Sequence, residues 1–397
     1  MTATIADPKL LRNLADKVLA GHDLAPEEGL ALYRGLDLPS LGLLADRVRQ
    51  RLNPGDQVTY IIDRNLNPTN VCVTDCGFCA FYRSPGDAEA YVLPREVIYR
   101  KIDELIAQEG TQLLLQGGHH PALKTEWFAA LFADIKKRYP QIWIHGMSPP
   151  EITHLAKLEK RSVRSVIEEL HAAGLASIPG GGAEILVERV RKIIAPKKAS
   201  TDEWLDVPRQ AAALGLKCTA TMMFGHVETD AERVEHLTRV RDLQAECAPF
   251  TAFIPWTYQP EHTQMAELVP HKATVAEYLR TLAFARVYLQ NVPHLQASFV
   301  TQGMKTCQTG LGMGADDFGS VMLEENVVSS AGCSHPASVA EIERHIKDAG
   351  YTPQRRNMIY QPRPTPATDR FGRPPRQKAV VSASNPSSSA SASASDS

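Results

Sequence analysis

Residues 66–79 read LNPTNVCVTDCGFC, and this stretch places three cysteines, Cys72, Cys76 and Cys79, within eight residues. The run Leu66–Val71 predicts a strand that ends just before the first cysteine. Three thiols with C-x3-C-x2-C spacing therefore follow a strand on one short loop. In barrels of parallel strands the chemistry sits at the C-terminal ends of the strands, which is where this loop falls.

The three thiols suit an iron–sulfur cluster. Thiolates are soft ligands, and three of them hold three irons of a four-iron four-sulfur cubane, [4Fe-4S]. The fourth iron then lacks a protein ligand, and an open position is typical of a catalytic metal centre. Zinc is the alternative interpretation, but one short loop lacks the second ligand pair that zinc sites normally have, so a distant histidine would have to complete it.

Outward from this loop, short apolar strands alternate with amphipathic helices, which predicts parallel strands with helical crossovers. The expected strands are Leu66–Val71, Thr111–Gln116, Ile142–His145, Leu175–Ile178, Cys218–Phe224, Thr251–Pro255, Gln296–Val300 and Phe318–Met322. The expected helices are Arg95–Glu109, Thr125–Arg138, Val163–Ala173, Thr201–Leu214, Asp230–Glu246 and Lys272–Gln290. Six strands would give an open barrel; eight permit the complete α/β fold, a (β/α)8 TIM-like barrel, which we expect.

Four segments are expected along the chain. They are a helical N-terminal cap at 1–55, a barrel at 56–330, a C-terminal helical extension at 331–359 with a helix at Ala337–Ala349, and a disordered Pro/Ser-rich tail at 360–397. The cap follows from apolar residues at helical spacing between Leu10 and Leu52. The tail has almost nothing apolar to bury.

Composition narrows the class of protein. Of the 397 residues 43% are hydrophobic, enough for a large core, and the formal net charge of -2 gives no basic field for nucleic acid. No apolar run approaches the roughly 20 residues of a membrane span, and the N-terminus lacks a secretory signal, so a cytoplasmic location is expected. The scattered cysteines are interpreted as buried free thiols. They are Cys218, Cys247, Cys307 and Cys333.

Seven stretches together resemble the radical S-adenosylmethionine superfamily, in its menaquinone and deazaflavin branch, and within that branch the dehypoxanthine futalosine cyclase family. They are YIIDRNLNPTNVC (60–72), CGFCAFYRSPGDAEAYVL (76–93), LLLQGGHHP (113–121), IHGMSPPEI (144–152), SIPGGGAEIL (177–186), TATMMFGHVET (219–229) and GADDFGSVMLEENV (314–327). The resemblance runs from about Leu10 to Gly350. It implies a [4Fe-4S] cluster on the three loop cysteines, S-adenosyl-L-methionine on the open iron, and an external electron donor such as flavodoxin or ferredoxin.

The resemblance also implies a reaction. A 5′-deoxyadenosyl radical would abstract hydrogen from ribose C4′ of dehypoxanthine futalosine, and the substrate radical would attack the carboxyphenyl ring. The product would be cyclic dehypoxanthinyl futalosine, on the route to menaquinone. Aminofutalosine synthase and the deazaflavin-type synthases are the nearest alternatives; a non-catalytic iron–sulfur carrier or zinc-binding module is an alternative from another class.

The remaining motifs follow predicted strands and supply candidate cofactor contacts. These are Phe78, Phe81, Gln116, Gly117, Gly118, Ser148, Glu184 and Glu228. Glycines let a ligand approach the backbone, and a carboxylate at a strand end can bind ribose hydroxyls or an ammonium group. Many relatives in the superfamily carry Gly-Gly-Glu in the second loop, whereas this chain has His119 in place of the acid. The methionine amino group of S-adenosyl-L-methionine is then expected to contact backbone carbonyls or another side chain.

His226 and Asp317 are the candidate acid–base residues, from the FGHVE and GADDF motifs. A turn histidine and a turn-capping aspartate are the structural alternatives. Trp256 and Tyr258 follow the sixth predicted strand and either stack on an aromatic ligand or fill the core. Lys198 and its neighbour Lys197 form a solvated charge pair or bind a substrate carboxylate.

Overall fold

The structure is a computed structural model that describes residues 7–363. Residues 364–397, which contain most of the expected tail, lie outside the described residues. Within 7–363, no helix has both the length and the apolarity that crossing a bilayer requires. The helices are α1 Pro8–Leu19, α2 Pro26–Gly35, α3 Leu38–Leu52, α4 Arg95–Ala107, α5 Thr125–Arg138, α6 Pro149–Glu159, α7 Val163–Ala172, α8 Glu188–Ile194, α9 Thr201–Ala213, α10 Asp230–Cys247, α11 Val275–Tyr288, α12 Phe299–Gln302, α13 Met304–Leu311, α14 Val327–Ser330 and α15 Val339–Asp348. The strands are β1 Gln57–Ile61, β2 Asp63–Leu66, β3 Gln112–Leu115, β4 Trp143–Gly146, β5 Leu175–Ile178, β6 Lys217–Phe224, β7 Phe250–Thr257, β8 His294–Leu295, β9 Asp317–Ser320 and β10 Thr352–Arg355.

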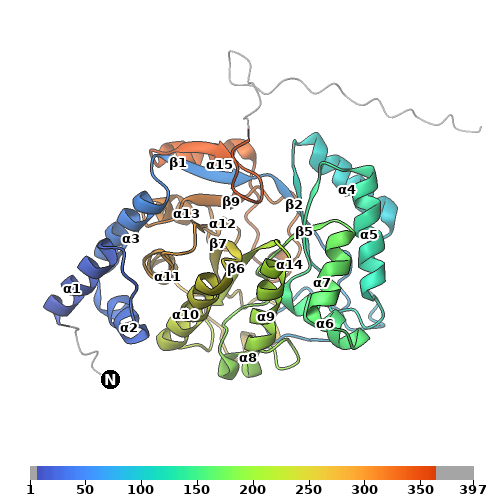
Figure 1. Cartoon of the computed structure of the whole chain (residues 1–397), viewed down its shortest axis with the longest axis horizontal. Coiled ribbons are helices and arrows are strands. Elements are labelled where there is room, and N and C mark those ends of the chain that lie inside the picture. The colour runs from blue at the N-terminus through green and yellow to red at the C-terminus, as the bar shows by residue number, and fades with distance from the viewer. Residues whose placement is uncertain (1–6, 364–397) are drawn as a thin grey trace, which may run out of the picture. The chain divides into compact units, whose positions relative to one another are not determined.

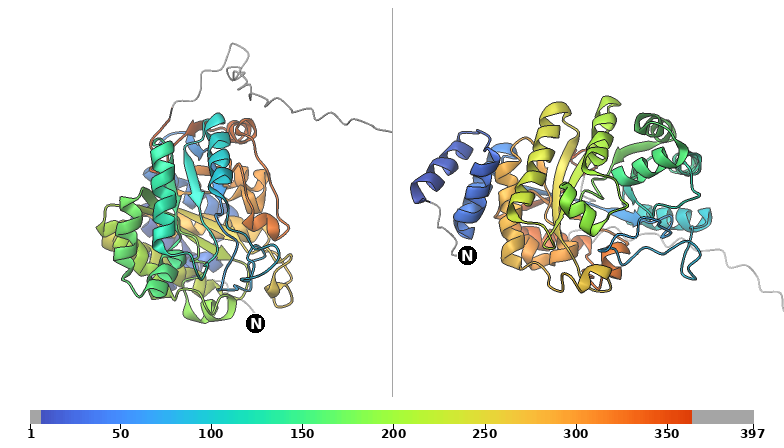
Figure 2. Two further views of the ribbon diagram at one scale, coloured as in Figure 1. Left: turned by 90° about the vertical axis from the view of Figure 1, so that its right-hand side faces the viewer. Right: turned by 90° about the horizontal axis from the view of Figure 1, so that it is seen from below.

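The strands form a parallel barrel. One sheet has the order β2-β3-β4-β5-β6-β7-β8 and a second has the order β10-β1-β9. Only Ile62 separates β1 from β2, and β9 bonds to β8 through Asp316 N to Leu295 O (3.1 Å) and Ala297 N to Asp317 O (2.9 Å). Since β9 also pairs with β1, the sheet curls back on itself, with helices outside it (Figures 1 and 2). The predicted α/β TIM-like fold is confirmed.

In the described part of the chain, three helices precede the barrel. Asp37 caps α3 by accepting a hydrogen bond from Ser40 N (2.9 Å), and α3 packs against α11 while α2 packs against α10. In Figure 1 these helices flank the barrel on the side of α10 and α11. The proposed boundary between cap and barrel lies between the end of α3 and the start of β1.

The first strand lies earlier than predicted. The prediction of Leu66–Val71 is wrong for all but its first residue, because β1 and β2 occupy 57–66 and the segment after Leu66 is a loop. Two causes are visible. Pro68 lacks the N–H that a ladder needs, and Asp63 is a buried polar residue inside the strand, so hydrophobicity alone did not reveal it.

The eighth-strand region also differs from prediction in part. The segment expected as strand Gln296–Val300 is mostly loop and α12, after a short β8 that ends at Leu295. The segment after β10 then closes the N-terminal end of the barrel: Tyr360 stacks on His294, with 3.6 Å between ring centroids. The extension expected at 331–359 therefore contains a strand that the sequence did not predict, besides the helix α15.

Candidate active site

The cysteine loop is held in place by its backbone. Cys72 N donates to Arg83 O (2.9 Å), Val73 N to His119 O (3.1 Å), and Gly77 N to Ile194 O (2.9 Å). A side chain at Gly77 would be too close to Met265, because its Cβ would lie 2.9 Å from Met265 Cγ. The loop is thus fixed between the segment after β3, the end of α8 and the segment after β7.

The chemistry of the loop fits a cubane cluster. Cys72, Cys76 and Cys79 are all free thiols. Burial raises the pKa of the Cys76 thiol to about 12, and the nearby Lys198 ammonium acts in the opposite direction by favouring the thiolate. Among residues 7–363 no three His, Cys, Asp or Glu side chains converge on one metal ion. A cubane does not require the three thiolates to converge on one ion, because each thiolate binds a different iron.

A buried carboxylate from α6 reaches the glycine loop after β3. Glu151 accepts hydrogen bonds from Gly117 N (2.9 Å), Ser148 N (2.8 Å) and Ser148 Oγ (2.6 Å). Burial raises the pKa of Glu151 to about 7. Gly118 packs against the segment before the cysteines, since a Cβ there would lie 2.1 Å from Val71 O. Glu151 therefore ties the loop after β3 to the loop after β4, a link that the sequence analysis missed.

His119, which follows the two glycines of the loop after β3, supports the cysteine loop. Its Nδ1 lies 2.7 Å from Thr74 Oγ1, and its ring stacks on His154 with 5.0 Å between centroids. Burial lowers the pKa of His119 well below its ordinary value. A neutral histidine in this position can hydrogen-bond to Thr74 without adding a charge beside the cysteine loop.

Glu184 connects the glycine-rich loop after β5 to the cysteine loop. Its carboxylate is buried, 3.0 Å from Lys198 Nζ and 3.8 Å from Arg191. Lys198 Nζ in turn lies 5.2 Å from the ring centre of Phe78, between two of the cysteines. Glu184 has a left-handed backbone, with φ of 41°. Lys198 is thus no solvated charge, whereas Lys197 is largely exposed and pairs with Asp75 at 2.8 Å.

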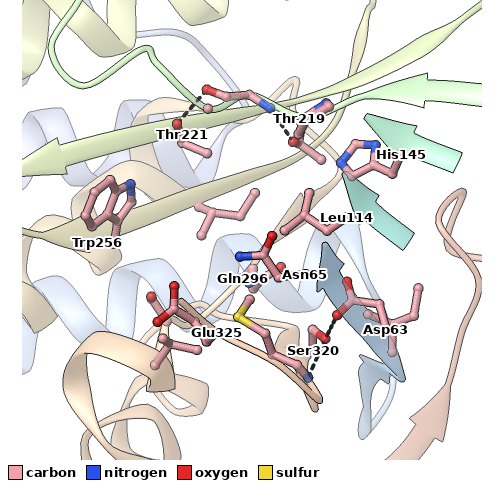
Figure 3. Close-up of a pocket in the computed structure, with 18 of the residues that line it drawn as sticks. Asp63, Asn65, Leu114, His145, Thr219, Thr221, Trp256, Gln296, Ser320 and Glu325 are labelled. Atoms are coloured by element: carbon pink, nitrogen blue, oxygen red, sulfur yellow. Dashed lines mark hydrogen bonds between the residues drawn. The ribbon is translucent and has the colours of Figure 1, made fainter. Parts of the chain in front are cut away.

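The barrel encloses a cavity of about 260 Å³. Its polar lining residues include Asp63, Asn65, Gln112, Gln116, His145, Thr219, Thr221, Gln296, Ser298, Thr301, Ser320, Glu325 and Arg356. Figure 3 shows Asp63 and Ser320 on one side of the cavity and Trp256 on the other. Trp256 therefore faces the cavity, whereas Tyr258 is buried and bonds to Thr263 Oγ1 at 2.6 Å.

The cavity reaches the loops that carry the cofactor candidates. Gln116, Gly180 and Gly181 belong to its wall, and a Cβ on Gly181 would lie 2.3 Å from Gln116 Nε2 and 3.5 Å from Ser148 Cβ. Gly182 packs beside Lys198, whose Cε would lie 3.2 Å from an added Cβ. Contacts therefore run from the cysteine loop through Lys198 and the triple glycine to the cavity wall.

Two of the predicted site residues are bound within their own loop. His226 Nε2 donates to Met223 O (3.0 Å), and its Nδ1 accepts from Val227 N (2.8 Å). Glu228 accepts from Gly225 N (2.7 Å) and from Arg233 Nε (2.8 Å) on α10. The structure places neither side chain in the cavity wall. Phe81 is half-buried near the cysteines, and its carbonyl accepts from Arg83.

Asp317 is fully buried in an ion pair. Its carboxylate accepts from Arg356 Nε (2.5 Å) and Nη2 (3.0 Å), from Thr59 Oγ1 (2.5 Å) and from Gly319 N (2.9 Å). Arg356 lines the cavity but Asp317 does not. The geometry therefore favours an internal structural role for Asp317, since its acceptor positions are taken.

The polar residues inside the barrel were not predicted from the sequence. Alternate strand residues face one side of a sheet, so Asp63 and Asn65 on β2, and Thr219 and Thr221 on β6, point into the barrel. Polar side chains at alternating positions of buried strands were the available signal. The prediction of buried free thiols for the scattered cysteines is consistent with the structure, in which only Cys247 is half-exposed.

Solved structures show the same fold. Methylornithine synthase (PylB) superposes with a TM-score of 0.68 over 86% of this chain and 97% of that one, at 17% identity. The profile described as the Radical SAM superfamily matches residues 66–240, from the end of β2 into α10. A TIM-like barrel with a C-x3-C-x2-C loop after its first strand is thus that of a radical S-adenosylmethionine enzyme.

The C-terminal part of the chain indicates a smaller family within this superfamily. A profile described as the CofH/MqnC C-terminal region matches residues 247–369. Relatives named cyclic dehypoxanthine futalosine synthase are 47% identical in Streptomyces coelicolor, over 88% of each chain, and 41% identical in Halalkalibacterium halodurans, over 88% of this chain and 94% of that one. A Thermus thermophilus relative named aminodeoxyfutalosine synthase is 36% identical over 90% of this chain and 96% of that one. The chain belongs to the radical S-adenosylmethionine superfamily, in the family of the cyclic dehypoxanthine futalosine synthases.

Proposed function

We propose that the protein converts dehypoxanthine futalosine to cyclic dehypoxanthinyl futalosine in menaquinone biosynthesis. One observation carries the proposal: a cavity inside the barrel, with several polar side chains in its wall, is linked by direct packing to a loop with three free thiols. The names of the two relatives with the higher identities support the choice of substrate. A [4Fe-4S] cluster on Cys72, Cys76 and Cys79, with S-adenosyl-L-methionine bound, would supply a 5′-deoxyadenosyl radical able to take hydrogen from ribose C4′.

The chain's own residues would orient the cofactor and shield the site. Glu184 is held by Lys198 beside the cysteine loop, where a carboxylate can accept hydrogen bonds from hydroxyl or ammonium groups. Gln116 and the triple glycine form the passage from that loop to the cavity, and Gly181 leaves space that a side chain would fill. The cavity holds the substrate away from water, which protects a reactive radical.

The cavity lining suits a substrate that is both polar and aromatic. Trp256 offers a ring face for stacking, and the amides of Asn65, Gln112, Gln116 and Gln296 offer donors and acceptors for hydroxyl and carbonyl groups. An external one-electron donor, such as flavodoxin or ferredoxin, is part of the proposal.

An anaerobic assay tests this function. The protein with reconstituted cluster is given a one-electron reductant, S-adenosyl-L-methionine and dehypoxanthine futalosine, and products are identified by mass spectrometry. We expect a product lighter than the substrate by two hydrogens, together with free 5′-deoxyadenosine. An aminofutalosine synthase would instead incorporate the adenosyl group, so a product that contains it would contradict the proposal.

A matched pair of cysteine variants tests the cluster assignment. Cys76→Ser is expected to lose bound iron, 5′-deoxyadenosine and cyclised product. Cys247→Ser, which changes a half-exposed thiol on α10, is expected to keep all three. Full activity in Cys76→Ser would refute the assignment.

A further inference from the structure

Asp63 is a carboxylate inside the cavity that none of the roles described so far uses. It lies at the start of β2, is 3% exposed, and lines the cavity wall. One of its oxygens accepts from Ser320 Oγ on β9, and the other from Gln112 Nε2 on β3 at 3.0 Å. Three barrel strands therefore hold one carboxylate at the cavity surface (Figure 3).

We propose that Asp63 is the proton acceptor in the last step of the cyclisation, and that Ser320 and Gln112 are its positioning residues. The inference rests on the proposed function. The cyclised substrate radical loses one proton and one electron to recover its aromatic ring. Its ring C–H bond breaks, and the proton passes to an Asp63 oxygen. The broken C–H bond leaves two electrons, and the radical already has one unpaired electron. Two of these three electrons complete the aromatic system. The third goes to a one-electron acceptor of the iron–sulfur or flavodoxin class.

Gln112 can bind Asp63 in both of its protonation states. Its Oε1 is buried and accepts no hydrogen bond from any residue in the described range 7–363. A half-turn of the amide exchanges Oε1 and Nε2, so the side chain can donate to ionised Asp63 or accept from its O–H after protonation. An unsatisfied buried acceptor costs stability, so its presence beside the carboxylate is consistent with a group that changes its protonation state.

The surrounding charges leave Asp63 able to take up a proton near neutral pH. Burial raises the pKa of Asp63 to about 6, while Arg356 and the two hydrogen bonds act in the opposite direction. Arg356 is itself paired with Asp317. His145 on β4 stays neutral, because burial lowers its pKa to about 3, and the pKa of Tyr360 is raised by burial.

Glu325, the other carboxylate in the cavity wall, is already bound to backbone amides. Glu325 accepts from Val327 N and Val328 N (both 2.8 Å) and from Ser329 N (2.7 Å), so it caps α14. The matched control therefore lies outside the cavity: Glu168 on α7 is exposed and allows the same carboxylate-to-amide change away from the cavity wall.

The experiment measures the ratio of cyclised product to 5′-deoxyadenosine in the reconstituted enzyme. Asp63→Asn is expected to keep deoxyadenosine formation but lower the ratio by about 100-fold or more, the usual contribution of a positioned acid or base. Glu168→Gln is expected to keep the wild-type ratio. A wild-type ratio in Asp63→Asn, or an equal loss in both variants, would overturn the inference. Absence of cyclised product from the wild type would overturn the proposed function itself.

Ser320→Ala gives a second test that does not depend on Asp63→Asn folding. In the wild type the ratio should fall on acidification through about pH 6, where Asp63 takes up a proton. The Ser320 hydroxyl lowers the pKa of Asp63, so its removal should move this acidic limb to higher pH. A limb that stays in place would show that Asp63 does not accept the proton.

Discussion

Replacing Asp317 with asparagine should destabilise the protein, because it removes the anion that pairs with the buried Arg356 guanidinium. In the wild type the Arg356 side chain is 4% exposed, and the Asp317 carboxylate pairs with its positive charge. Asp317→Asn leaves that cation buried and unpaired, although the amide oxygen can still accept from Gly319 N. Breaking a buried ion pair by removing one partner costs about 3–5 kcal/mol.

This energy converts to a measurable thermal shift. An unfolding entropy of about 2.1 cal/mol/K per residue gives about 0.7 kcal/mol per kelvin over residues 7–363. The thermal midpoint of Asp317→Asn should therefore fall by about 4–7 °C. The measurement is differential scanning of the reconstituted protein under anaerobic conditions at a fixed scan rate. The product-to-deoxyadenosine ratio is measured in parallel, well below the midpoint.

A double-mutant cycle separates the ion pair from other effects. Arg356→Met should also lower the midpoint, because it leaves Asp317 buried without its cation. The double variant Asp317→Asn with Arg356→Met should be less destabilised than the sum of the two, since neither charge remains. A wild-type midpoint for Asp317→Asn, combined with loss of cyclised product, would refute this reasoning and return Asp317 to a direct chemical role.

Two further predictions concern the passage and the glycine loop. Gly181→Ala should displace the Gln116 amide, since the new Cβ would lie 2.3 Å from Nε2. It should therefore raise KM for dehypoxanthine futalosine several-fold (about 1 kcal/mol). The control Gly312→Ala, where the nearest atom would be 3.7 Å away, should leave KM unchanged, and equal KM values in both variants would contradict this account of the passage. Glu151 has a folded-state pKa of about 7, above its unfolded value, so its favourable contribution is complete at low pH and is lost as pH rises through 7. The thermal midpoint of Glu151→Gln relative to wild type should therefore increase between about pH 5 and pH 8, and a constant difference would show that the carboxyl does not titrate in this window.

Secondary structure and the presence of a cysteine loop were largely readable from the sequence. The helix at Thr125–Arg138 and the strand at Leu175–Ile178 were predicted with the bounds that the structure shows, because their apolar residues repeat with the period of the element. The cysteine spacing pointed to the cluster because three soft ligands on one loop need no distant partner. The first strand was misplaced because a buried strand is not expected to contain Asp63 unless the barrel is known to enclose a cavity with polar side chains in its wall.

The sequence by itself determined the strand–helix alternation, the three-thiol loop and the family, because each depends on residues that are close together in the chain. Only the tertiary structure decided what Asp63, Glu151 and Asp317 contact. Their partners Ser320, Gly117 and Arg356 lie on other strands or loops, and closure of the barrel brings them together. Periodicity reports which face of an element is buried, but which polar groups meet on that face depends on the register and closure of the whole sheet.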